Sequence, residues 1–148
     1  MRYYIDCEFD GHNGPLLSMA LVREDGRSIH IRTTNEASDP WVVDNVMPLM
    51  GRHSATIDAH VIESLVGGEL REFVAEDQKP LIIADSPVDI SRFCSAFMTG
   101  ADCGYLPNNL PIMKFEVHDV DCYPTLLSGA VQHNAWWDAM ALRDRLDA

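Results

Sequence analysis

The sequence lacks the marks of membrane proteins and of domains held together by disulfides or zinc. No apolar run approaches the ~18 residues of a membrane span. The four cysteines form no CxxC pair and no Cys/His pattern with zinc spacing. The N-terminal stretch MRYYIDCEFD carries acids where a signal peptide carries an apolar run. We therefore expect a soluble, cytoplasmic protein with reduced thiols and no membrane partner.

Basic residues are also scarce, with 11 Lys and Arg against 23 Asp and Glu and a net charge of −12. This balance argues against a general basic surface for nucleic acids. It does not exclude a nucleic-acid enzyme, because carboxylates that hold metal ions contribute to such an excess. An acidic surface attracts long polyanions poorly, so short oligonucleotides are the better fit among nucleic-acid substrates.

No repeat, low-complexity tract or linker divides the 148 residues, so we predict a single domain over 1–148. Strands are predicted from runs of β-forming residues, and Asp25-Gly26 marks a hairpin turn between the second and third. The wholly apolar PLIIAD is typical of a strand buried on both faces. The predicted strands are RYYIDCEF (2–9), PLLSMALVRED (15–25), SIHIRTT (28–34), PLIIAD (80–85) and MKFEVHDVD (113–121).

Helices are predicted between and after these strands. One over 40–50 is interrupted near Pro48, and one over 56–76 is weakened at Gly67-Gly68. A third covers 86–98, where apolar residues recur at helical spacing, and a last one starts near His133. We expect an α/β fold with a five-stranded mixed sheet, three antiparallel strands followed by βα units, flanked by helices.

The first strand contains two acids, Asp6 and Glu8, in the motif DCE. Side chains alternate along a strand, so both carboxylates point to one face. Two carboxylates on a strand this apolar repel each other and lose hydration, which a bound cation relieves. Hard cations such as Mg²⁺ or Mn²⁺ take oxygen ligands. The alternative is an edge strand with a solvated acidic face.

Two further acids flank a helix start in ADSPVD. Asp85 ends the buried strand and Asp89 falls in the first turn of the next helix. In α/β sheets, functional sites form where strands end and the following helices begin. The alternative is structural, since Asp85 or Ser86 is a good N-cap and an acid in the first turn suits the helix dipole.

The stretch QHNAWWDAMALRDRL places His133 five residues before Asp138. At about 100° per residue they would lie about 140° apart around a helix, so they cannot share one face. If both act, His133 must lie in the preceding loop or first turn, with Asn134 as the N-cap. The alternative is a surface histidine and a solvated aspartate. Trp136 and Trp137 are interpreted as packing residues rather than base platforms.

In order and spacing, DCE, SPVD and HNAWWDA resemble the DEDDh branch of the 3′–5′ exonucleases, an RNase H-like group that includes oligoribonuclease and RNase T. The resemblance covers essentially the whole chain, and the His-x4-Asp element followed by ALR is its most specific part. PWVVDNVMPLM also resembles a segment of a compact bacterial exoribonuclease group in this family. FDG stands where the family often has Thr-Thr-Gly.

The resemblance implies a two-metal hydrolase that releases nucleoside 5′-monophosphates from the 3′ end of RNA or single-stranded DNA, with RNA favoured. His133 would be the general base. Phe9 and Asp10 would line the pocket for the terminal nucleotide. Family members often form homodimers. The carboxylates implied to hold two Mg²⁺ or Mn²⁺ ions are Asp6, Glu8, Asp89 and Asp138, with Asp85 in reserve as the third acid.

Two other functions stay open from the sequence. An RNase H-like endonuclease would share the acidic metal site but would not need His133 before Asp138. A nucleic-acid-binding module of the same fold without catalytic activity would need neither the metal site nor His133.

Overall fold

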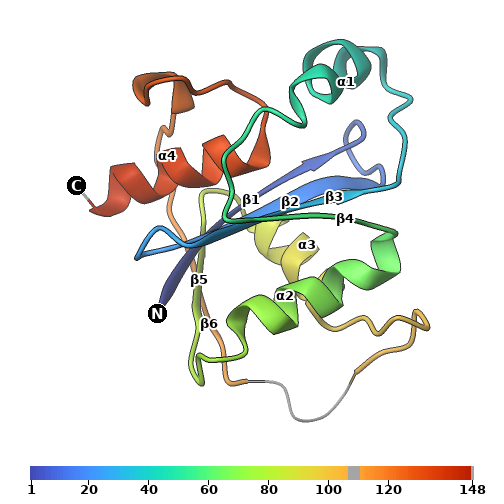
Figure 1. Cartoon of the computed structure of the whole chain (residues 1–148), viewed down its shortest axis with the longest axis vertical. Coiled ribbons are helices and arrows are strands. Elements are labelled where there is room, and N and C mark those ends of the chain that lie inside the picture. Colours follow the sequence, from blue (N-terminus) through green and yellow to red (C-terminus); the bar gives the residue numbers. More distant parts are fainter. Residues whose placement is uncertain (107–110, 148) are drawn as a thin grey trace.

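In the computed structural model, which describes residues 1–106 and 111–147, six strands form one mixed sheet in the order β4-β3-β2-β1-β5-β6 (Figure 1). The strands are β1 Arg2–Phe9, β2 Leu16–Arg23, β3 Ser28–Thr33, β4 Ile57–Val61, β5 Leu81–Ala84 and β6 Lys114–Val117. The helices are α1 Pro40–Asn45, α2 Val66–Val74, α3 Pro87–Phe97 and α4 Ala135–Asp147. Among the helices in these ranges, none has the length and hydrophobicity needed to cross a bilayer.

The first three strands form the predicted antiparallel meander. The hairpin turn at Asp25-Gly26 is confirmed: Gly26 has a φ of 95° and its N–H donates to the carbonyl of Arg23. A positive φ is the conformation that glycine adopts without a steric penalty. The remaining pairs are parallel: β4 lies beside β3, β5 beside β1, and β6 beside β5.

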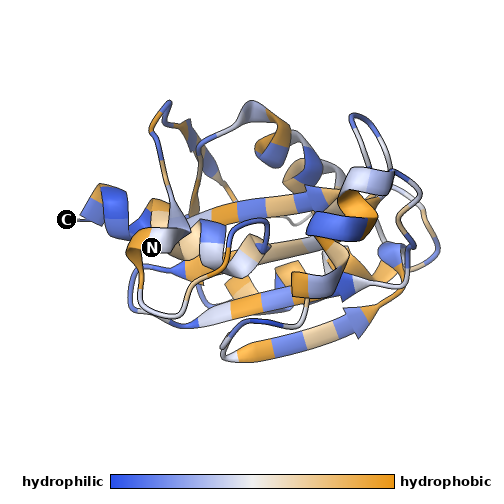
Figure 2. Cartoon of the chain, turned by 90° about the horizontal axis from the view of Figure 1, so that it is seen from above, coloured by the Kyte–Doolittle hydropathy of each residue, from blue (hydrophilic) through white to orange (hydrophobic). Residues whose placement is uncertain are grey.

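The predicted helix over 56–76 is wrong in its first half, where the chain forms β4 instead, and only Val66–Val74 is helical. The residues of β4 alternate between contact with the core and exposure to solvent, which is the period of a strand. Figure 2 shows such alternation of hydrophobic and hydrophilic residues along the strands. Because β4 pairs with β3, the sheet has six strands rather than the predicted five.

Gly67, where we expected a break, lies inside the first turn of α2. A Cβ atom there would lie 2.1 Å from the carbonyl oxygen of Ala96 and 2.7 Å from that of Thr99. The glycine therefore permits the close approach of α2 to the end of α3. It is a packing residue and not a helix terminator.

The other predicted elements are confirmed with small changes of bounds. The segment over 40–50 forms α1 followed by a 3-10 turn, Met47–Leu49, that contains Pro48. Proline has no N–H to continue the α-helical pattern, which explains the interruption. Strand β6 is shorter than predicted and its residues are exposed to solvent, as expected for an edge strand.

Helices cover both faces of the sheet (Figure 1). On one face α2 and α3 pack against apolar residues of the central strands, including Ile5 and Cys7 of β1. On the other face, α4 packs against β1 and β2, and its Leu142 contacts Tyr4. Since side chains alternate along β1, Asp6 and Glu8 lie on the α4 side, together with Tyr4.

Candidate functional site

The acidic residues predicted from the sequence converge at one edge of the sheet. Strands β1 and β5 are parallel neighbours, so their C-terminal ends meet. Asp6 and Glu8 come from the end of β1, while Asp85 follows β5 and Asp89 lies in the first turn of α3. Asp138 reaches the same place from the first turn of α4. Fold topology thus gathers residues from across the chain.

The carboxylates form two groups that share one member. The nearest oxygen atoms of Asp6, Asp85 and Asp89 all lie within 4.8 Å of one another. The same holds for Asp6, Glu8 and Asp138. Asp6 therefore lies at the centre, with one group of acids on each side. We call this set the carboxylate cluster.

Burial and mutual repulsion raise the pKa values of the carboxylate cluster. Loss of hydration is the largest cause in each case, and the neighbouring negative charges add to it. The pKa of Glu8 is raised to about 8, and the pKa values of Asp89 and Asp138 to about 7. The pKa of Asp6 is raised well above its usual value. Near neutral pH, full ionisation of this cluster needs a compensating positive charge.

The structure brings both candidates for the third acid to the cluster. Ser86 caps α3 by accepting a hydrogen bond from the N–H of Val88 at 3.2 Å, so neither Asp85 nor Asp89 is needed as the cap. Asp89 is 4% exposed, whereas Asp85 is partly buried. Burial raises the pKa of both, and the charge of Asp85 contributes to the rise at Asp89. Both remain candidates for one metal-binding position.

At the start of α4, His133 lies before the helix and Asp138 lies within its first turn, as their spacing in the sequence requires. Asn134 caps the helix, since its side-chain oxygen accepts from the N–H of Trp136 at 3.2 Å. Asp138 in turn accepts from the N–H of Asn134 at 3.2 Å, which orients its carboxylate. His133 lies in the preceding loop, exposed, with a φ of 59°. It is thus separate from the helix that carries Asp138.

A cavity of about 430 Å³ adjoins the carboxylate cluster. Glu8 and Phe9 line one part of it, and His12 and Trp41 line another. The ring of His133 meets that of Trp41 edge-to-face, with 5.0 Å between the ring centroids. His133 therefore lies beside a residue of the cavity wall.

Sequence reasoning missed Trp41 and His12. Trp41 is 54% exposed, whereas Val42 of α1 and the C-cap residue Val46 are buried in a cluster with Leu17 and Met50. A large exposed aromatic residue off the apolar stripe of a short helix is the signal that could have identified it. His12 follows the first strand in a turn and carries no comparable signal.

Asp10, predicted to line the nucleotide pocket, turns towards the segment before α1. Its carboxylate accepts from the N–H of Ser38 at 2.9 Å, the hydroxyl of Ser38 at 2.8 Å and the N–H of Asp39 at 2.9 Å. These hydrogen bonds lower the pKa of Asp10. Asp39 then caps α1, so Asp10 fixes the start of the helix that carries Trp41.

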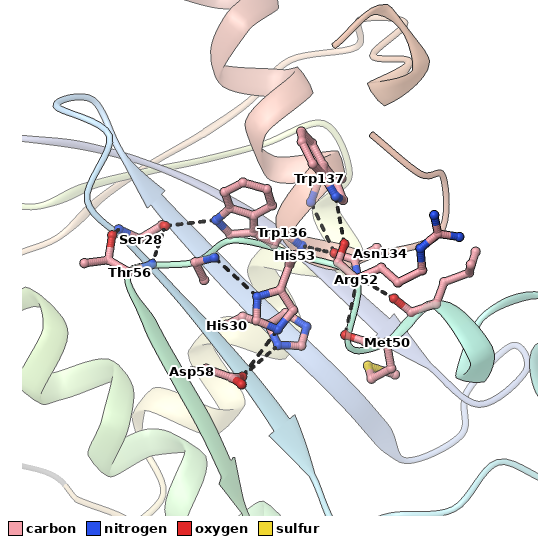
Figure 3. Close-up of polar contacts among 12 residues, drawn as sticks. Ser28, His30, Met50, Arg52, His53, Thr56, Asp58, Asn134, Trp136 and Trp137 are labelled. Atoms are coloured by element: carbon pink, nitrogen blue, oxygen red, sulfur yellow. Dashed lines mark hydrogen bonds and ion pairs between the residues drawn. The ribbon is translucent and has the colours of Figure 1, made fainter. Parts of the chain in front are cut away.

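The two tryptophans of α4 lie in packed positions. Trp136 is buried and its indole N–H donates to the hydroxyl oxygen of Ser28 at 2.9 Å (Figure 3). Trp137 is partly buried and donates to the carbonyl of Arg52 at 2.8 Å. These contacts agree with the packing interpretation.

Comparison with known proteins gives a partial match. No protein-family model matches the chain. Two curated proteins do: the 3′-5′ exoribonucleases of Mycobacterium tuberculosis strains CDC 1551 / Oshkosh and ATCC 25618 / H37Rv. Each is 42% identical over 53 residues, which cover 32% of this chain and 32% of the relative. The match thus spans about a third of the length of these curated relatives.

Proposed function

We propose that this chain is a metal-dependent 3′–5′ exonuclease of the DEDDh type, with an RNase H-like fold in a single domain over 1–148. It would release nucleoside 5′-monophosphates from the 3′ end of RNA or single-stranded DNA, with RNA favoured. The convergence of the carboxylate cluster beside a cavity carries the proposal. The partial relatives are named 3′-5′ exoribonucleases, which supports hydrolysis in the 3′–5′ direction and RNA as the substrate.

The carboxylate cluster would hold two divalent ions, Mg²⁺ or Mn²⁺. Asp6 would contribute to both positions, with Asp89 (or Asp85) at one and with Glu8 and Asp138 at the other. All-oxygen ligands suit hard cations, and two positive ions would offset the repulsion that raises the pKa values. When bound, the ions would supply an activated water and charge compensation at the leaving 3′ oxygen.

His133 would take the proton from the attacking water. An imidazole can accept a proton near neutral pH, and a loop position lets the ring move towards a bound 3′ end. Its contact with Trp41 holds it beside the cavity in the meantime. Asp138 would stay fixed, because the N–H of Asn134 orients its carboxylate.

The terminal nucleotide would occupy the cavity next to Glu8. Phe9 and Trp41 offer aromatic surface for a base, and base stacking on such side chains is tolerant of sequence. The guanidinium of Arg92 lies 4.5 Å from the ring centroid of Phe9, which places a positive charge close to where phosphates would pass. Asp10 would contribute by fixing the start of α1.

The acidic net charge favours short oligonucleotides over long polymers. A homodimer that completes the substrate groove, as is common in the family that the sequence resembles, stays a prediction.

The test is hydrolysis of short, 5′-labelled RNA and matched single-stranded DNA with Mg²⁺ or Mn²⁺. We expect a descending ladder, nucleoside 5′-monophosphates as products and no reaction with a chelator. An oligonucleotide with a blocked 3′ end is the control. Cleavage of the blocked substrate would identify an endonuclease. Binding without metal-dependent hydrolysis of any substrate would identify a non-catalytic module.

A further inference from the structure

A second cluster of metal-ligating side chains lies away from the carboxylate cluster, on β3, β4 and the loop before β4. It consists of His30, His53 and Asp58 (Figure 3), and we call it the histidine cluster. We propose that this cluster is a binding site for a transition-metal ion of the Zn²⁺ class, separate from the carboxylate cluster. The proposal does not depend on the proposed function.

The three side chains converge on one point. Atom Nε2 of His53 lies 3.4 Å from Oδ1 of Asp58, and Nδ1 of His30 lies 3.7 Å from the same oxygen. The three ligand atoms all lie within 4.8 Å of one another. His30 and Asp58 are directly paired across β3 and β4, so their side chains share a face of the sheet. Small side-chain rotations would bring all three to a common ion.

His30 gives an independent indication of a ligand. Its side chain is 1% exposed, and neither ring nitrogen has a hydrogen-bond partner within residues 1–106 and 111–147. Buried polar atoms are nearly always paired, so two orphaned nitrogens on one buried ring call for an explanation. An ion bound by Nδ1 would satisfy one of them. Burial, helped by the charge of His53, lowers the pKa of His30 to about 4, which keeps the ring neutral.

The ligand types indicate which ion would bind. Two imidazoles and one carboxylate suit Zn²⁺ and similar transition metals, whereas Mg²⁺ prefers oxygen ligands only. The side chain of Asp58 is 68% exposed, so solvent can reach the ion from that side and complete a four-coordinate site. The carboxylate and histidine clusters would therefore select different metals.

Metal binding has a specific consequence at His53. The N–H of Ala55 donates to Nδ1 of His53 at 3.3 Å, which leaves the ring proton on Nε2, facing Asp58. Coordination through Nε2 would move that proton to Nδ1 and break the hydrogen bond from Ala55. The Ala55 amide and the His53 ring are therefore the atoms whose NMR signals should change on binding.

The loop that carries His53 also holds the start of α4. The side-chain amide of Asn134 donates to the carbonyl of Leu49 at 2.8 Å, and the indole N–H of Trp137 donates to the carbonyl of Arg52 at 2.8 Å (Figure 3). An ion that joins His53 to β3 and β4 would fix this loop. The site would thus support the helix that carries Asp138.

The test uses the full chain with Asp6→Asn and Asp138→Asn, so that binding of the added metal by the carboxylate cluster is removed. Zn²⁺ is titrated by calorimetry and Co²⁺ by visible absorption after chelator treatment. We expect one ion per chain and an absorption spectrum typical of four-coordinate Co²⁺. His53→Gln and Asp58→Asn should each weaken binding by about 100-fold or more, since even loss of an outer-sphere partner costs about 10- to 100-fold.

His60→Gln is the matched control, because His60 is an exposed histidine on the same strand as Asp58 and should leave binding unchanged. The side chain of Asp58 is 68% exposed, whereas that of His53 is 7% exposed, so circular dichroism is used to check that both variants fold. Zn²⁺ binding that survives both substitutions, or no binding in the parent protein, would overturn the proposal. So would unchanged NMR signals of His53 and Ala55 on adding Zn²⁺.

Discussion

The two clusters lie in one row across the sheet and yet respond oppositely to burial. Asp6 pairs with Ala20, Ala20 with His30, and His30 with Asp58, so all four side chains point to the same face. Two strand spacings, or about 10 Å, separate Asp6 from His30. Burial raises the pKa of Asp6 and lowers the pKa of His30 to about 4.

The shifts differ in direction because burial favours the neutral form of each group. A buried histidine is neutral at physiological pH, so His30 buries no charge even without a metal ion. A group of buried carboxylates becomes neutral only by taking up protons, which bound cations would displace. We therefore expect ionisation of the carboxylate cluster to depend on bound cations, whereas the histidine cluster would stay uncharged with or without an ion.

The largest effect should follow from Asp138→Asn, which keeps the shape of the side chain and removes its charge. We expect kcat/KM for a short RNA to fall by about 10³-fold or more, because a metal ligand is lost. The metal-free variant should at the same time melt at a higher temperature than the parent, because one of the repelling carboxylates is gone. Activity assays and thermal unfolding in chelator measure both.

A loss of both activity and metal-free stability would contradict this, since it would mean that the carboxylate has a structural role. His60→Gln serves as the control for both measurements.

Asp89→Asn and Asp85→Asn, compared side by side, assign the third acid. We expect a loss of about 10³-fold for Asp89→Asn and of about 10-fold or less for Asp85→Asn. Asp89 is the more buried and lies in the first turn of α3, where the helix fixes its position. Steady-state kinetics at saturating Mn²⁺ provide the comparison. Near-normal activity in Asp89→Asn would reverse the assignment.

His133→Ala should lower turnover by about 10²-fold and leave metal affinity largely unchanged, because the proposed role of His133 is that of a general base and not of a metal ligand. Manganese titration monitored by calorimetry gives the affinity, and kcat gives the loss. Trp41→Ala, which removes the ring beside His133, is a useful second variant, because it should raise KM more than it lowers kcat. Equal loss of metal affinity and turnover in His133→Ala would make His133 a ligand.

Local patterns in the sequence predicted most of the fold. The strands and helices with clear periodicity were predicted with the smallest errors in their bounds. The meander, β5 and α3 follow directly from alternation, apolar runs and helical stripes. β4 was missed because IDAHV is short and leads into a helical segment, so its period of two was read as part of a helix. This segment forms a strand by pairing with the free edge of β3, and that edge exists only once the sheet has assembled.

The carboxylate and histidine clusters also differ in how far local sequence patterns predict them. The acids of the carboxylate cluster occur in short motifs at strand ends and helix starts, so their spacing in the sequence carries information. The histidine cluster draws His30 from a strand, His53 from an irregular loop and Asp58 from the strand that sequence reasoning missed. No local pattern joins them. Trp41 does lie off the apolar stripe of α1, but only the packing of α1 shows that it faces the cavity.

The dependence of stability on pH should separate the two clusters without any substitution. In the folded state the pKa of Glu8 is about 8 and those of Asp89 and Asp138 about 7, against about 4 when unfolded. The folded protein thus holds more protons than the unfolded chain between pH ~4 and ~8, and its free energy of unfolding falls as pH rises through this window. Each excess proton contributes a slope of about 1.4 kcal/mol per pH unit.

His30 acts in the opposite sense over part of that window. Its pKa is about 4 when folded and about 6.5 when unfolded, so the unfolded chain holds the extra proton between these values and stability rises with pH there. One histidine cancels the excess proton of only one carboxylate below pH ~6.5, so the three carboxylates still dominate there, and above it they act alone. In chelator, denaturant unfolding should therefore show a loss of stability as pH rises from ~5 to ~8, with the slope declining above pH ~7 as the carboxylates lose their protons. Asp138→Asn should flatten that loss, and Mn²⁺ should abolish it, because metal ions bind the deprotonated acids. Stability that rises over this range in the metal-free protein would show that the acids are not coupled as their positions require.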